Sequence, residues 1–102
     1  MEKKPGKYES VFIVNPELNE EDTQAIITRF KDLVAANNGN LESCDEWGKR
    51  RLAYPINDLN EGYYVLMTFI APPEFIAELH RIYNITDGIL RSIVIRLEDK
   101  EA

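Results

Sequence analysis

Three consecutive cations, Lys49, Arg50 and Arg51, stand between two aromatic residues, Trp47 and Tyr54. Basic residues with aromatics interleaved are typical of nucleic-acid surfaces, where cations contact phosphates and rings stack on bases. Charges of this kind also protect the edge of a sheet, because they stop another sheet from pairing with it. The two rings could equally be cross-strand packing partners. Both interpretations of the segment stay open on the residues alone.

The charge of the whole chain opposes RNA binding by these cations alone. Its 102 residues include 18 acidic and 12 basic side chains, for a net charge of -6. Three phosphate contacts would release about two to three counterions, so affinity would fall about 20- to 40-fold between roughly 50 and 200 mM salt. Such anchoring is weak, and the acidic residues reduce long-range attraction to RNA. We therefore expect RNA binding to need a second protein.

The other reactive side chains do not form a catalytic or metal-binding set. His80, the sole histidine, falls in a predicted helix, where packing or a solvent-facing role is more usual than acid-base chemistry. Cys44 is the sole cysteine, which excludes an internal disulfide and a site built on paired thiolates. Asp45 and Glu46 are adjacent in a predicted strand, so their carboxylates point to opposite faces. We expect no enzyme, no cofactor, no metal site and no small-molecule substrate.

Length and hydropathy indicate one small domain. No stretch approaches the roughly 18 consecutive apolar residues of a membrane span, and the basic start has no apolar run behind it. We expect a cytoplasmic protein without membrane contact. We also expect a single domain over residues 1–97, followed by a short charged tail at 98–102.

Strand and helix patterns alternate along the chain. Strands are predicted at 8–15, about 41–56, 62–70 and 89–97, with a turn at 57–61. One helix is predicted to begin after Asn19, which can cap it, and to stop at Gly39 in a left-handed conformation. Pro72 and Pro73 are expected to open a second helix. The predicted apolar stripes of the two helices are Ile26, Phe30, Leu33 and Val34, and Ile76, Leu79 and Tyr83.

This order of elements is that of the α+β, ferredoxin-like βαββαβ split fold, a four-stranded antiparallel sheet with both helices on one face. A sheet with one uncovered face should alternate apolar and polar residues. In the first strand, however, Phe12 and Val14 point one way while Val11 and Ile13 point the other. We expect the surplus apolar surface to bind a partner protein. The alternative is that a small twisted sheet exposes such residues harmlessly.

Four segments together resemble ribosomal protein six of the bacterial small subunit. They are YESVFIVNPEL at 8–18, WGKRRLAYPI at 47–56, GYYV at 62–65 and ILRSIVIR at 89–96. The resemblance implies a ferredoxin-like structural protein of the ribosome, without catalysis or cofactor. It also implies binding to small-subunit ribosomal RNA in the central domain, together with ribosomal protein eighteen. Carried over by motif, the candidates for the RNA or partner surface are Lys49, Arg50, Arg51 and Tyr54, and less strongly Trp47.

Some features depart from that family or leave alternatives open. Asn38-Gly39-Asn40 stands where a double glycine is expected, and the tail is brief. A single-stranded RNA binder of the RRM kind shares the topology, but its third strand would carry a base where Glu61 stands. A small-molecule sensor or acylphosphatase-like domain on the same fold is the other alternative, although the chain has no glycine-rich anion loop.

Overall fold

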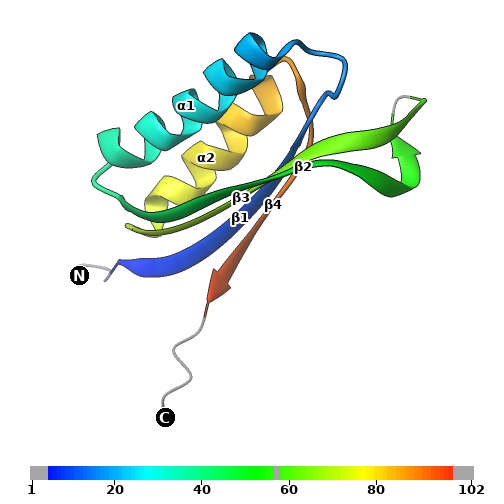
Figure 1. The fold of residues 1–102 in the computed structure, drawn as a ribbon. Helices are drawn as coiled ribbons and strands as arrows, with labels where there is room; N and C mark the ends of the chain where they lie inside the picture. The colour runs from blue at the N-terminus through cyan, green and yellow to red at the C-terminus, as the bar shows by residue number, and fades with distance from the viewer. Residues whose placement is uncertain (1–4, 57, 98–102) are drawn as a thin grey trace.

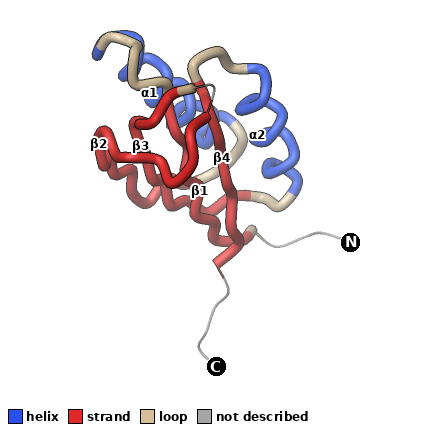
Figure 2. Tube along the Cα trace, turned by 90° about the vertical axis from the view of Figure 1, so that its right-hand side faces the viewer, coloured by secondary structure: helices blue, strands red, loops and turns tan. Residues whose placement is uncertain are grey.

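The computed structural model describes residues 5–56 and 58–97, so the charged tail predicted at 98–102 lies outside the described residues. The elements are β1 (Gly6–Val14), α1 (Glu20–Ala36), β2 (Asn40–Ile56), β3 (Leu59–Ala71), α2 (Glu74–Ile85) and β4 (Ile89–Leu97). The strands form one sheet in the order β2-β3-β1-β4, and all neighbours are antiparallel. Both helices lie against one face of this sheet (Figures 1 and 2). The predicted ferredoxin-like fold is confirmed.

The core lies between the central strands and the two helices. Its fully enclosed aromatic centre is formed by Phe12, Phe30 and Tyr83, with the Phe30 and Tyr83 ring centroids 4.4 Å apart. The Tyr83 hydroxyl is hydrogen-bonded to the buried Ser10 hydroxyl at 2.7 Å. Burial raises the pKa of Tyr83. Every second residue of β1 and β3 points into this core, as the strand period requires.

The start of α1 follows the sequence prediction. The Asn19 side chain accepts a hydrogen bond from the Asp22 backbone N–H at 2.7 Å, which satisfies one of the free donors of the first turn. The buried side of the helix is rotated relative to the predicted stripe, because Ile26 and Leu33 are only half-buried. The buried positions are Thr23, Ile27, Phe30 and Val34.

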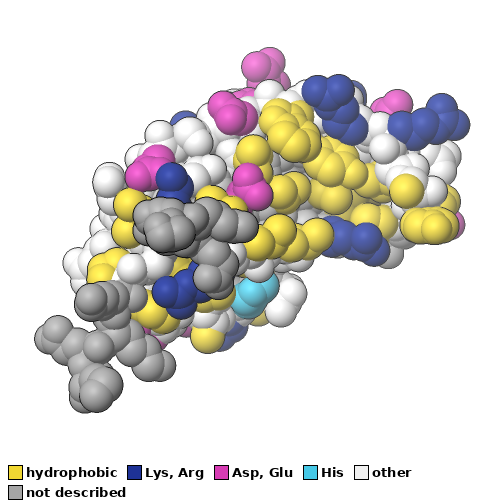
Figure 3. All heavy atoms as spheres, turned by 90° about the horizontal axis from the view of Figure 1, so that it is seen from below, with side chains coloured by type: hydrophobic (Ala, Val, Ile, Leu, Met, Phe, Trp, Pro, Cys, Tyr) yellow, Lys and Arg dark blue, Asp and Glu magenta, His cyan; other side chains and the backbone are white. Residues whose placement is uncertain are grey.

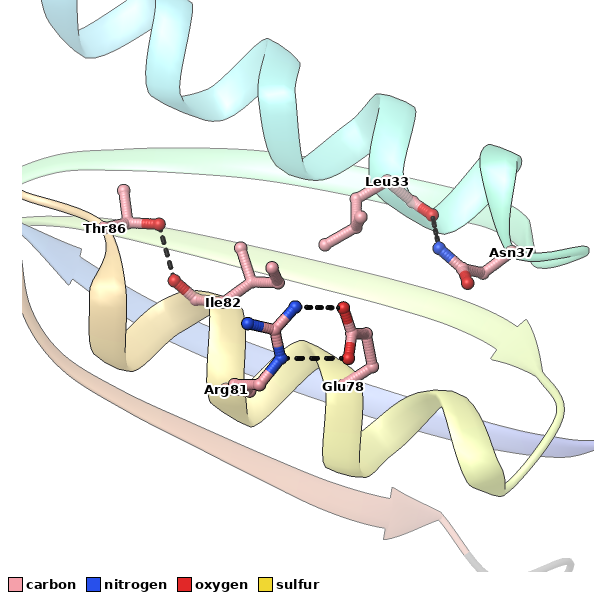
Figure 4. Close-up of polar contacts among 6 residues, drawn as sticks. All are labelled: Leu33, Asn37, Glu78, Arg81, Ile82 and Thr86. Atoms are coloured by element: carbon pink, nitrogen blue, oxygen red, sulfur yellow. Dashed lines mark hydrogen bonds and ion pairs between the residues drawn. The ribbon is translucent and has the colours of Figure 1, made fainter.

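The end of α1 differs from the prediction. Asn38, with φ 65, is the left-handed residue, and Gly39 is not. Gly39 is instead needed for space, because a Cβ there would lie 2.7 Å from Val34 Cγ1 and 2.8 Å from the Val34 carbonyl oxygen. Just before this point, the Asn37 side-chain amide donates to the Leu33 carbonyl oxygen at 2.9 Å (Figure 4). An asparagine can therefore end the helix while the glycine lets the chain pass close to it.

Helix α2 begins after Pro72 and Pro73 as predicted, with Pro73 at the cap position. Its predicted stripe was partly wrong, because Ile76 is only half-buried. The buried residues are Phe75, Leu79, Ile82 and Tyr83. On the exposed side, Arg81 donates two hydrogen bonds to Glu78, at 2.6 and 3.1 Å, and thereby lowers the pKa of that carboxyl (Figure 4).

The hairpin of β2 and β3 is longer than predicted and extends past the rest of the sheet. The predicted turn at 57–61 was too long, because Leu59, Asn60 and Glu61 belong to β3. Strand β1 ends at Val14, which pairs with Tyr63 on one side and with Ile89, the first residue of β4, on the other. Beyond that row the hairpin has only its own two strands (Figure 1). We call residues 49–56 and 58–62 the arm.

Candidate RNA and partner interface

A bulge in β2 turns Trp47 toward the face of the sheet that the helices leave bare. The pairing of β2 with β3 shifts between Glu46 and Gly48, and Gly48 has φ 80, a left-handed conformation that glycine adopts at little cost. The Trp47 ring stacks on Tyr64, with centroids 6.3 Å apart and an interplanar angle of 15°. Trp47 is 47% exposed, so the pair presents an aromatic surface.

The register of the arm separates the three cations. Lys49 pairs with Tyr63, whose side chain packs against the core on the helix side of the sheet. Arg50 pairs with Gly62, which lies against Ile13 on the bare side. Arg51 therefore points to the helix side again. All three cations are exposed, and they serve two different faces of the arm.

Lys49 and Arg51 line a hollow of about 530 Å³ between the arm and the chain that follows β1. Three acidic residues, Glu17, Asp58 and Glu61, line the same hollow. These carboxylates offset the positive charge of the two cations, because opposite charges at close range weaken the field felt by a phosphate. Arg50 has no comparable acidic group in a shared hollow among the residues the structure describes.

The bare face carries a band of apolar side chains with charges around it (Figure 3). On β4, Ile93 is 50% exposed and Ile95 is 49% exposed. Arg91 lies beside Ile13, which in turn pairs with Tyr64, so this arginine is at the other end of the row that begins with the Trp47 bulge. The expected surplus of apolar surface on this face is thus present in the structure.

Sequence reasoning did not select Arg91, Ile93 or Ile95 as site residues. Their signal was the step of two between them within a predicted strand, which places all three on one face. Which face that is depends on the pairing of β4 with β1, and a single strand does not contain this information.

The predicted site residues do not all meet. Tyr54 lies on the arm and is 79% exposed, whereas Trp47 lies before the arm and stacks on Tyr64. Arg50 is the one predicted cation on the same face of the sheet as the Trp47 pair. The candidate residues therefore form two groups, one on the bare face and one along the arm and its helix-side hollow.

Glu46 joins β2 to two other elements at the base of the arm. Its Oε1 accepts hydrogen bonds from the Tyr63 hydroxyl of β3 and from the Gln24 side-chain amide of α1, each at 2.8 Å. The hydrogen bond to the Glu46 carboxylate raises the pKa of Tyr63 to about 12. Glu46 is thus a structural acceptor in this arrangement.

The remaining chemistry-bearing residues agree with a binding protein. Cys44 is half-buried against the core, and burial raises the pKa of its thiol, which disfavours the reactive thiolate. Within residues 5–56 and 58–97, no three His, Cys, Asp or Glu side chains are grouped as metal ligands. Over the same residues, neither helix has the length and apolar character needed to cross a membrane.

Comparison with known proteins gives one consistent result. The family model described as ribosomal protein S6 matches residues 7–96. The small ribosomal subunit protein bS6 of Caldanaerobacter subterraneus subsp. tengcongensis is 50% identical over 92 residues, covering 90% of this chain and 97% of that protein. The bS6 protein of Clostridium novyi is 52% identical, covering 89% and 96%. The crystal structure of 30S ribosomal protein S6 from Thermotoga maritima superposes with a TM-score of 0.87 at 30% identity, covering 92% of this chain and 89% of that one.

Proposed function

This chain belongs to the ribosomal protein S6 family, and we propose that it binds small-subunit ribosomal RNA in the central domain together with ribosomal protein eighteen. Membership in the family confirms the resemblance stated from the sequence. It also makes the chain a component of the small ribosomal subunit and not an enzyme.

The observation that carries the RNA-binding proposal is the exposure of the arm cations. Lys49, Arg50 and Arg51 stand on a two-stranded projection, and none of them forms an ion pair within the described part of the chain. Long cationic side chains without a protein partner can exchange their counterions for phosphates. Tyr54 adds an exposed ring to the same arm, where a base could stack on it.

The bare sheet face supports the need for a second protein. Its exposed Trp47, Ile93 and Ile95 would be sheltered by a partner, and aromatic residues with neighbouring arginines are frequent at the energetic centre of protein interfaces. Arg50 and Arg91 stand at opposite ends of this face. A partner bound here would add its own RNA contacts to those of the arm.

The test of the arm is the variant Lys49→Ala, Arg50→Ala, Arg51→Ala in a titration of a central-domain ribosomal RNA fragment with ribosomal protein eighteen present. We expect weaker RNA binding and a salt dependence that is shallower by about two to three, because two to three fewer counterions are released. The fold should persist, because all three side chains are exposed.

The matched control replaces Arg29, Lys31 and Arg81, three cations of the helices, by alanine. It changes the net charge of the chain by the same amount and should leave the salt dependence unchanged. RNA affinity of the arm variant equal to that of the parent protein would assign the three cations to edge protection instead.

A further inference from the structure

One carboxylate holds the base of the arm. Glu46 Oε1 is the shared acceptor for Tyr63 and Gln24, so three elements, β2, β3 and α1, meet at a single oxygen atom. Among the described residues, the bond between Gln24 and Glu46 is the one side-chain hydrogen bond that joins β2 to α1. We call Glu46, Tyr63 and Gln24 the clamp.

The clamp lies where the sheet changes from four strands to two. Tyr63 pairs with Val14, the last residue of β1, and also with Lys49, the first residue of the arm. Gly48, between the clamp and the arm, holds the bulge with its φ of 80. Bulges bend and twist a strand, and a two-stranded ribbon has little stability of its own in water. The direction of the arm is therefore set at its base.

We propose that Glu46 is a positioning residue for RNA binding, because its two hydrogen bonds fix the direction in which the arm presents Lys49, Arg50 and Arg51. This inference rests on the proposed function of the arm. Without the clamp the arm samples more directions, and the observed affinity falls in proportion to the fraction of molecules in the binding direction.

The charge of Glu46 makes the inference easy to separate from direct contact. A carboxylate next to the cations repels phosphate, so its removal should by charge alone strengthen RNA binding. A loss of affinity on removal of Glu46 must then come from the loss of its hydrogen bonds. Glutamine at the same position keeps a side-chain oxygen acceptor and removes only the charge.

The test compares Glu46→Ala and Glu46→Gln with a matched control, Glu42→Ala, in the RNA titration with ribosomal protein eighteen. Glu42 is also an acidic residue of β2, but it pairs with Lys7 at 3.1 Å, at the opposite end of the strand from the arm. We expect Glu46→Ala to weaken RNA binding about 3- to 10-fold, because two hydrogen bonds to a charged group are lost. Glu46→Gln and Glu42→Ala should bind at least as tightly as the parent protein.

Two further readouts distinguish positioning from general destabilisation. The salt dependence of Glu46→Ala should equal that of the parent protein, because the same phosphates are contacted once the arm is in place. In ultraviolet titration, the pKa of Tyr63 should fall from about 12 toward its ordinary value of about 10 in Glu46→Ala. Tyr63→Phe, which removes one of the two bonds, should show an intermediate loss of affinity.

The arm variant lacking all three cations separates this inference from the proposed function. In that background, Glu46→Ala should have no further effect on RNA affinity, because nothing remains to be positioned. If the three cations matter for RNA binding but Glu46→Ala leaves affinity unchanged, the positioning role is wrong and the proposed function stands. If Glu46→Ala weakens binding equally with and without the cations, Glu46 serves stability only. If the cations do not matter, both ideas fail.

Discussion

At the scale of single residues, this protein contains few polar groups in its core, and the one buried side-chain pair stands out. Ser10 and Tyr83 are 73 residues apart in sequence, yet their hydroxyl groups share a 2.7 Å hydrogen bond inside the core. A buried hydroxyl that loses its partner pays the full cost of desolvation. This pair therefore ties β1 to α2 by a bond that must be kept.

Tyr83→Phe should lower the free energy of unfolding by about 1 to 2 kcal/mol, because the Ser10 hydroxyl then stays buried without this partner. Chemical denaturation followed by circular dichroism measures the change. Tyr54→Phe is the control, because it deletes a hydroxyl from a residue that is 79% exposed. Adding Ser10→Ala to Tyr83→Phe should cost less than the sum of the single changes, and strict additivity would contradict the coupling.

At the scale of the elements, the sequence predicted what local chemistry determines. Asn19 with the acids behind it predicted the start of α1, and Pro72 with Pro73 predicted the start of α2. Features that depend on distant contacts were missed. Both Asn38 and Gly39 can adopt a left-handed conformation, and only the close approach to Val34 decides that the glycine is needed at the second position.

Gly39→Ala should therefore destabilise the protein by about 1 to 3 kcal/mol, because the new Cβ would overlap the end of α1. Asn38→Gly, one residue earlier, should change stability by less than about 0.5 kcal/mol, since its relief at positive φ is offset by greater backbone entropy in the unfolded chain. Thermal unfolding compares the two variants. A larger effect at Asn38 than at Gly39 would contradict this account of the helix end.

The candidate site was predicted in composition but not in geometry. Alternation along a strand indicated that Lys49, Arg50 and Arg51 would serve both faces, and the register confirms it. The length of the arm could not be predicted, because it depends on where β1 and β4 end beside the hairpin. The clamp was equally hidden, since Gln24 and Glu46 are 22 positions apart and belong to different elements. Gly48 within a strand was a readable sign of the bulge.

At the scale of the whole molecule, two features divide the work of binding. The arm offers exposed cations, and the bare face of the sheet offers an apolar surface that the helices do not cover (Figures 1 and 3). The net charge of -6 opposes RNA, so the cations alone give weak binding. The central claim is therefore that a protein on the bare face must complete the RNA interface.

The direct test is a titration of a central-domain ribosomal RNA fragment with this protein at about 150 mM salt, with and without ribosomal protein eighteen. Ile93→Glu and Ile85→Glu extend the series. Both replace an exposed isoleucine by an acid, but Ile93, 50% exposed, lies on the bare face, whereas Ile85, 60% exposed, lies at the end of α2.

We predict tight RNA binding only when ribosomal protein eighteen is present, and loss of that binding for Ile93→Glu but not for Ile85→Glu. Equal RNA affinity of the parent protein with and without ribosomal protein eighteen would contradict the claim.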